Sequence, residues 1–130
     1  DSSFDLVVSH ILLHETSRTA LINIFNECYR LLKDGGIMLH LEQRQHKGME
    51  TFEQFYYDWD TLNNNEPFWG ALHDTNLSNL AKGAGFKSRD IFESMQKNTN
   101  TKETLLKKIG DGGDFKRSAF WFIFTAKKET

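Results

Sequence analysis

Two short apolar runs on either side of one amphipathic segment constrain the fold of this chain more than any other feature. Residues 4–9 and 37–42 are each of strand length and are apolar at nearly consecutive positions, which is typical of strands covered on both faces. Between them, apolar side chains recur at the three-to-four spacing of a helix that packs on a sheet, at Ala20, Leu21, Ile24, Phe25, Cys28, Tyr29 and Leu32. The segment therefore predicts a βαβ unit with a parallel strand pair.

The ends of the predicted helix carry their own signals. Thr16 and Ser17 precede the apolar stripe, and either hydroxyl can cap the first turn. Asp34, Gly35 and Gly36 follow it, and glycine adopts the left-handed conformation that commonly ends a helix. We therefore expect the helix to stop at these glycines and the second strand to begin directly after them.

The remaining segments predict further helices and two more strands. Asp74 is expected to cap a helix that ends at Gly85. Charged residues interrupt residues 87–95, which favours a strand at the edge of the sheet. Residues 100–109 predict a short helix. Residues 119–126 are apolar at nearly every position, so they predict a strand inside the sheet.

These segments resemble the class I S-adenosylmethionine (SAM) dependent methyltransferases. Residues 4–9 and 29–39 look like the fourth strand, the end of the following helix and the fifth strand of that family, with Asp34 where the family usually has proline. Residues 77–86 resemble the next helix and its Ala-Gly-Phe junction, and residues 120–122 resemble the closing strand. The resemblance implies an α/β, Rossmann-like half-domain, whose mixed sheet has the order 4-5-7-6 in the family's numbering and an antiparallel last strand.

The resemblance also implies that residues 1–130 are the C-terminal part of a single methyltransferase domain. In the family, the glycine-rich half that binds SAM comes before these strands, and none of the nine glycines here stands in a suitable strand-to-helix turn. Residues 4–9 would then present an unpaired strand edge, which favours a homo-oligomer formed through the first strand. We expect the chain to be inactive alone.

The candidate cofactor and catalytic residues follow the first strand, because open α/β sheets bind ligands beyond the carboxyl ends of their strands. By the resemblance, Ser9, His10 and Ile11 lie along the methionine part of SAM. The alternative is a loop that merely closes the sheet. His14 is the candidate catalytic residue, as a general base, because imidazole titrates near neutrality. Its alternative is a histidine packed against the following helix.

The candidate substrate-binding residues lie after the second strand and in an insertion, residues 43–73, that covers the substrate site in the family. Aromatic side chains there can wall a pocket for an apolar or aromatic acceptor. The substrate-binding candidates are Glu42, Arg44, Tyr56, Tyr57 and Trp69. Phe52, Phe55 and Trp59 recur at helical spacing and are predicted to form the packing face of the insertion's helix.

Composition and charge limit the classes of partner that this chain is expected to bind. The net charge of -2 offers no basic stripe, so we expect no nucleic-acid partner. No apolar run approaches the ~20 residues of a membrane span, and a single cysteine, Cys28, cannot form an internal disulfide. These features predict a cytoplasmic protein with no membrane partner. We expect no metal site, because the loop carrying His10 and His14 does not hold both rings on one helical face.

The predicted function is methyl transfer from the cofactor SAM to a small-molecule acceptor. Positioning and desolvation can supply most of the rate in such a displacement. Two alternatives stay open: a methyltransferase-like domain that has lost catalysis and serves as an interaction or scaffold module, and another nucleotide-binding α/β fold such as a reductase half. The acceptor is not predicted, because the insertion is the least family-like segment.

Overall fold

The computed structural model describes residues 2–43, 45–97 and 120–130. One sheet contains β1 (Phe4–His10), β2 (Leu32–Glu42), β3 (Ile91–Lys97) and β4 (Phe120–Lys127). The α-helices are α1 (Arg18–Leu31), α2 (Thr51–Asn63), α3 (Trp69–His73) and α4 (Leu77–Ala84), and 3-10 turns occupy Leu13–Glu15 and Ser88–Asp90. The helix predicted for residues 100–109 lies outside the described residues.

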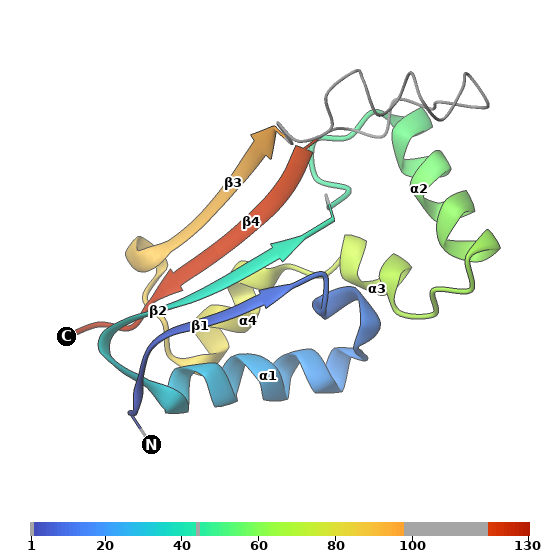
Figure 1. Ribbon diagram of the computed structural model, residues 1–130. Helices are drawn as coiled ribbons and strands as arrows, with labels where there is room; N and C mark the ends of the chain where they lie inside the picture. Colours follow the sequence, from blue (N-terminus) through green and yellow to red (C-terminus); the bar gives the residue numbers. More distant parts are fainter. Residues whose placement is uncertain (1, 44, 98–119) are drawn as a thin grey trace, which may run out of the picture.

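The sheet has the predicted topology. Its strand order is β1-β2-β4-β3, and α1 connects the parallel neighbours β1 and β2 (Figure 1). The C-terminal strand β4 lies between β2 and β3 and is antiparallel to both. In the family's numbering this order is 4-5-7-6 with the last strand antiparallel, so the fold prediction is confirmed.

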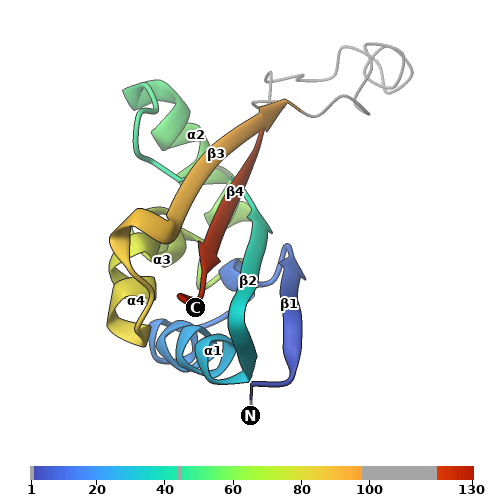
Figure 2. The same cartoon turned by 90° about the vertical axis from the view of Figure 1, so that its left-hand side faces the viewer.

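Three helices cover one face of the sheet. Figure 2 shows α1, α3 and α4 on the same side of the strands. Phe25 of α1, Met38 of β2 and Phe124 of β4 are fully buried between these layers, and burial of each such side chain stabilises the fold by about 1.5–3 kcal/mol. On the other face of β1, Leu6 and Val8 are exposed. Coverage of both faces, as predicted for this strand, is therefore not found within the described residues.

Cys28 lies in the helix-facing core, as predicted. Its side chain is buried on α1, and burial raises the pKa of the thiol to about 11. The thiol is therefore neutral at physiological pH and packs as a small apolar group. The outer edge of β1 pairs with no strand among the described residues, and association through that edge stays a prediction.

The first helix starts where predicted but ends earlier. Ser17 is its N-cap, and the Ser17 hydroxyl accepts a hydrogen bond from the Ala20 amide. The helix ends at Leu31, and β2 already includes Gly35, which has a φ of 80°. The helix does not need a glycine stop, because the Lys128 ammonium donates to the carbonyl oxygens of Tyr29 and Leu32.

The start of α4 also differs from the prediction, whereas its end agrees. The N-cap is Asn76, whose side-chain oxygen accepts from the Asn79 amide, and Asp74 instead ends α3. Gly85 ends α4 with a φ of 120°. A Cβ atom at Gly85 would lie 2.8 Å from the Tyr29 ring, so both conformation and space require glycine.

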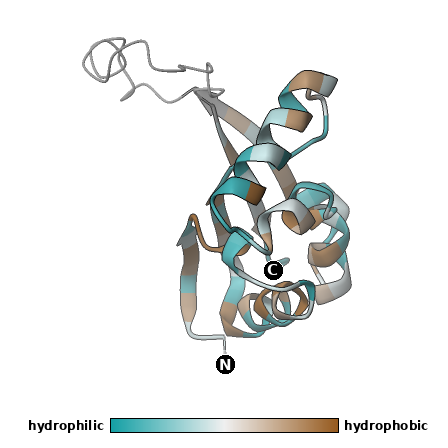
Figure 3. Cartoon of the chain, turned by 90° about the vertical axis from the view of Figure 1, so that its right-hand side faces the viewer, coloured by the Kyte–Doolittle hydropathy of each residue, from teal (hydrophilic) through white to brown (hydrophobic). Residues whose placement is uncertain are grey.

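The packing face predicted for α2 is wrong. Phe52, Phe55 and Trp59 are 67%, 62% and 48% exposed, and the buried residues of this helix are Tyr57, Asp60 and Thr61. Figure 3 shows hydrophobic segments along α2, which projects beyond the end of the sheet. Because the sheet does not extend beneath the helix, its apolar stripe has no layer to pack on.

None of the helices in the described ranges has the length and apolar character needed to cross a bilayer.

Candidate functional site

The candidates that follow β1 and β2 come together at one edge of the sheet. Ser9 pairs with His40 and His10 with Leu41 in the parallel register. The Ile11 amide extends this pairing and donates to the Leu41 carbonyl oxygen at 2.8 Å. The carboxyl ends of both strands therefore lie side by side, as the ligand-site prediction required.

The backbone turns sharply where β1 ends. Ile11 has a φ of 53°, which is unusual for a β-branched residue. Strained residues of this kind cost about 1–3 kcal/mol and cluster at functional sites. The turn leads directly into the 3-10 segment Leu13–Glu15, and so it determines where His14 lies.

The two polar cofactor candidates have different surroundings. The Ser9 hydroxyl forms a 2.6 Å hydrogen bond with His40 Nδ1, so its side chain is already engaged. His10 is exposed, and its ring centroid lies 5.5 Å from that of Trp121. Trp121 was predicted only as part of an inner strand. Its place at the start of an antiparallel strand was the available signal, because such a strand starts at the edge where its parallel neighbours end.

His40 is a core histidine, as its strand position indicated. Its ring stacks on Phe25 with an interplanar angle of 20°, and the residue is 1% exposed. Burial lowers the pKa of His40 to about 4. The ring is therefore neutral at physiological pH, and its hydrogen bond to the hydroxyl holds the Ser9 side chain in place.

Glu42 lies behind the loop that follows β1 and is 1% exposed. One carboxylate oxygen accepts hydrogen bonds from the Leu12 amide at 2.8 Å and the Leu13 amide at 2.5 Å, and the other lies 2.9 Å from His14 Nδ1. This arrangement differs from the substrate contact expected of Glu42. The carboxylate is fully engaged, and it holds the loop and the histidine in place.

The hydrogen bond to Glu42 determines which ring nitrogen of His14 carries the proton in the neutral ring. A carboxylate can only accept hydrogen bonds, so His14 Nδ1 carries a proton and Nε2 has the lone pair in the neutral ring. The hydrogen bond to Glu42 raises the pKa of His14 above its usual value, against the opposing effect of burial, and Glu15 and Glu66 raise it further. Nε2 lies 3.3 Å from a carboxylate oxygen of Glu15.

Trp69, a substrate-binding candidate, lies against this histidine. The ring centroids of Trp69 and His14 are 5.3 Å apart, and Trp69 Nε1 is buried without a hydrogen-bond partner among the described residues. His14 itself is 5% exposed. The 3-10 turn and α3 therefore bring a general-base candidate and an aromatic wall together, although the two residues are far apart in the sequence.

The other substrate candidates do not join this group. Tyr57 is buried and contacts His73 edge to face at 5.7 Å. Tyr56 lies on the outward side of α2, where it contacts Trp59 and helps line an apolar hollow of about 260 Å³. Arg44 lies outside the described residues. The structure thus brings Trp69 alone of the three aromatic candidates to His14.

Comparisons with known proteins agree with this geometry. Residues 1–40 match the sequence model of a methyltransferase domain family. The chain has the class I SAM-dependent methyltransferase fold. Phosphoethanolamine N-methyltransferase 2 from Haemonchus contortus, solved with phosphomonomethylethanolamine and S-adenosylhomocysteine, shows this fold at a TM-score of 0.60 and 20% identity, over 99% of this chain and 34% of that chain.

Two further methyltransferase structures give the same result. Human N-acetylserotonin methyltransferase, solved with SAM, matches with a TM-score of 0.54 and 17% identity over 97% of this chain and 30% of that chain. An arsenic(III) SAM methyltransferase from Chlamydomonas reinhardtii matches with a TM-score of 0.53 and 21% identity over 100% of this chain and 38% of that chain. The methyltransferase-fold chain therefore spans about a third of the length of these structures. No curated protein sequence matches it.

Proposed function

We propose that this chain is the C-terminal part of a SAM-dependent methyltransferase domain that acts on a small-molecule acceptor, with His14 as general base. The observation that carries the proposal is the pair of His14 and Glu42 at the carboxyl ends of two parallel strands. In a methyltransferase fold this edge faces the cofactor and the acceptor. The buried carboxylate orients the ring and leaves Nε2 as its proton acceptor.

We assign the contact with SAM to the end of β1 and the turn after it, at Ser9, His10 and Ile11. Because the Ser9 hydroxyl is bonded to His40, we assign its contact with the cofactor to backbone groups. Exposed His10 and the neighbouring ring of Trp121 offer a polar and an aromatic surface at the same edge. When bound, SAM supplies a methyl group activated by its sulfonium.

In the proposed reaction the residues of this chain bind and orient the acceptor and take up its proton. Nε2 of His14 would accept the proton of the acceptor's O–H or N–H as the acceptor's lone pair takes up the methyl group that the sulfonium supplies. Glu42 stabilises the imidazolium that forms. Trp69 packs against the histidine and shields it from water. The products are the methylated acceptor and S-adenosylhomocysteine.

The proposal is tested on the intact protein in two steps. Calorimetric titration with SAM should give a Kd below about 100 μM, which corresponds to roughly 5 kcal/mol. Release of S-adenosylhomocysteine is then measured with phosphoethanolamine and N-acetylserotonin, the acceptor types named for two of the structural neighbours. With whichever acceptor is turned over, His14→Gln should lower kcat by about 100-fold or more and leave the Kd for SAM unchanged.

Lys87→Gln, at an exposed residue in the turn before Ser88–Asp90, is the control and should retain kcat. If the folded intact protein does not bind SAM, the enzyme proposal fails and the scaffold alternative takes its place. If His14→Gln keeps full kcat, the enzyme proposal stands without a general base at this position.

A further inference from the structure

A second group of polar side chains lies where three segments meet. His46 belongs to the loop after β2, Asp58 to α2, and His73 is the last residue of α3. Oδ1 of Asp58 is 3.3 Å from Nε2 of His46 and 3.8 Å from Nδ1 of His73. One donor atom from each of the three residues lies within 4.8 Å of the other two. The amide of His46 also donates to the carbonyl oxygen of His73, which fixes the two backbones together.

Three ring nitrogens of these two histidines lack the hydrogen bonds that buried polar atoms normally make. The His73 side chain is 0% exposed, and within the described part of the chain neither of its ring nitrogens has a hydrogen-bond partner. Nε2 of His46 is also buried without one. Each buried polar atom left unsatisfied costs about 1–3 kcal/mol, so three in one place require an explanation.

The sequence predicted no metal site, from the loop of His10 and His14 alone; at this other place we propose that His46, Asp58 and His73 bind a divalent transition-metal ion of the class that prefers imidazole, such as Zn²⁺. Two imidazoles and one carboxylate are an established ligand set for zinc, with water in the fourth position. Ligand bonds of about 2.0–2.2 Å place the donor atoms of a tetrahedral site about 3.3–3.6 Å apart. The two distances from Asp58 Oδ1, 3.3 Å to His46 and 3.8 Å to His73, are close to this, and all three donor atoms lie within 4.8 Å of one another.

Asp74 adds an orienting contact that metal-binding histidines usually have. Oδ1 of Asp74 lies 3.1 Å from Nδ1 of His46. Since a carboxylate only accepts, Nδ1 carries the proton and Nε2 presents its lone pair toward Asp58. This contact is made outside the ligand set, and it selects the tautomer that a metal requires.

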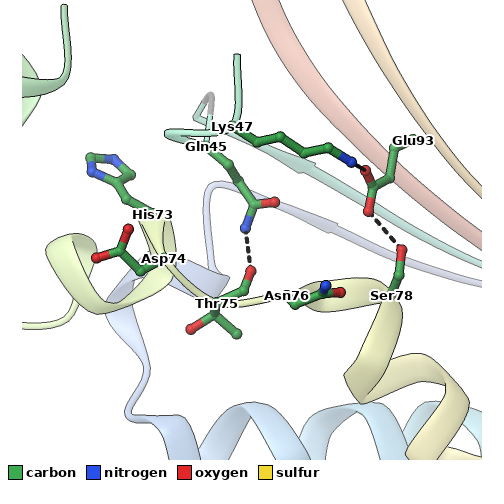
Figure 4. Close-up of a pocket in the computed structure, with 8 residues that line it drawn as sticks. All are labelled: Gln45, Lys47, His73, Asp74, Thr75, Asn76, Ser78 and Glu93. Carbon is green, nitrogen blue, oxygen red and sulfur yellow. Dashed lines mark hydrogen bonds and ion pairs between the residues drawn. The ribbon is translucent and has the colours of Figure 1, made fainter. Parts of the chain in front are cut away.

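Solvent reaches this group at Asp58, whose side chain is 52% exposed, and a pocket lies beside His73. A pocket of about 270 Å³ is lined by His73 and Asp74 on one side and by Lys47 and Glu93 on the other. Figure 4 shows the imidazole of His73 and the carboxylate of Asp74 at the margin of this pocket, which the Lys47–Glu93 ion pair bounds opposite them. A metal held here would connect α2 to α3 and to the loop after β2.

The test uses the intact protein freed of metal by a chelator. Calorimetric titration with Zn²⁺ should show one ion bound per chain, and Co²⁺ should give the intense visible absorption of a tetrahedral complex. His46→Gln and Asp58→Asn should each weaken Zn²⁺ binding by at least about 10-fold, and Asp74→Asn by about 10- to 100-fold. Hydrogen exchange in α2 should slow when Zn²⁺ is added.

Asp34→Asn, at an exposed aspartate near the start of β2, is the matched control and should bind Zn²⁺ as the unmodified protein does. His73 is not substituted, because replacement of a buried ring can unfold the chain. The proposal is overturned if the folded protein binds no Zn²⁺, or if His46→Gln and Asp58→Asn bind it as tightly as Asp34→Asn. Neither result bears on methyl transfer, which the SAM titration tests separately.

Discussion

Replacement of Glu42 by glutamine tests the central feature of the site. Glu42→Gln keeps the shape of the side chain but removes its charge, and it places an amide where the carboxylate meets Leu12, Leu13 and His14. Glu42 is 1% exposed, so water cannot compensate for the change. We expect both the stability of the protein and the pKa of His14 to fall.

The size of the effect follows from the three hydrogen bonds to Glu42. A hydrogen bond to a charged group contributes about 1.5–3 kcal/mol and a neutral one about 0.5–1.5 kcal/mol. The glutamine oxygen can still accept from the Leu12 and Leu13 amides, so each of these bonds loses about 1 kcal/mol. The free energy of unfolding should therefore fall by about 2–3 kcal/mol, with the greater loss where His14 is protonated.

The pH dependence has a definite sign. Because the pKa of His14 is raised in the folded protein, its stabilising effect is complete below the unfolded value of about 6.5 and is lost as pH rises through the folded value. Glu42→Gln removes the largest cause of that raised pKa. The difference in stability between the two proteins should therefore be greater at about pH 6 than at about pH 9.

Urea denaturation at the two pH values measures the stabilities, and the NMR shift of the His14 Cε1 proton reports its titration. Glu15→Gln is the matched control, because Glu15 also lies near the ring but its side chain is 56% exposed. Exposed pairs contribute about 0–1 kcal/mol, so this control should change stability and titration much less. The reasoning would be refuted if the two substitutions changed stability equally, or if the titration midpoint of His14 were unchanged in Glu42→Gln.

Two further predictions concern the fold. Gly85→Ala should destabilise the protein by about 1–3 kcal/mol, because alanine is strained at a φ of 120° and its Cβ meets the Tyr29 ring; Gly83→Ala, in the same helix with open space around it, should instead stabilise by about 0.5–1 kcal/mol. Thermal unfolding of the two variants checks the opposite signs. Separately, burial lowers the pKa of His40 to about 4, so stability should decrease as pH falls from about 6.5 toward 4. His40→Gln should flatten this part of a urea-midpoint profile, and an unchanged slope would contradict the assignment.

The order of the elements follows from local patterns. Apolar runs and helical spacing within residues 4–42 predict β1, α1 and β2, because each period reflects the backbone of a single element. The aromatic strand β4 was also predictable as an inner strand, since an edge strand is rarely apolar throughout. Helix ends were less predictable: Lys128, near the opposite end of the chain, satisfies the carbonyl groups that a glycine stop would otherwise satisfy.

The face of α2 shows where the same pattern misleads. Helical spacing at Phe52, Phe55 and Trp59 correctly indicates a helix with an apolar stripe, but these side chains are exposed. The spacing of apolar residues indicates which side chains share a face of the helix. The position of the helix, set by the loop before it, determines what that face packs against. Here the loop carries α2 past the end of the sheet (Figure 1).

Residue types and strand ends were enough to nominate His14, Glu42 and Trp69 as members of a site, yet their roles come from contacts between distant segments. Glu42 meets His14 across 28 positions because β1 and β2 are in parallel register and Ile11 turns the loop back over the strand end. His46, Asp58 and His73 meet because a loop and two helices converge there. No spacing of residues along the sequence predicts such contacts. They form because tertiary packing gives each loop one conformation, and only the folded structure shows which.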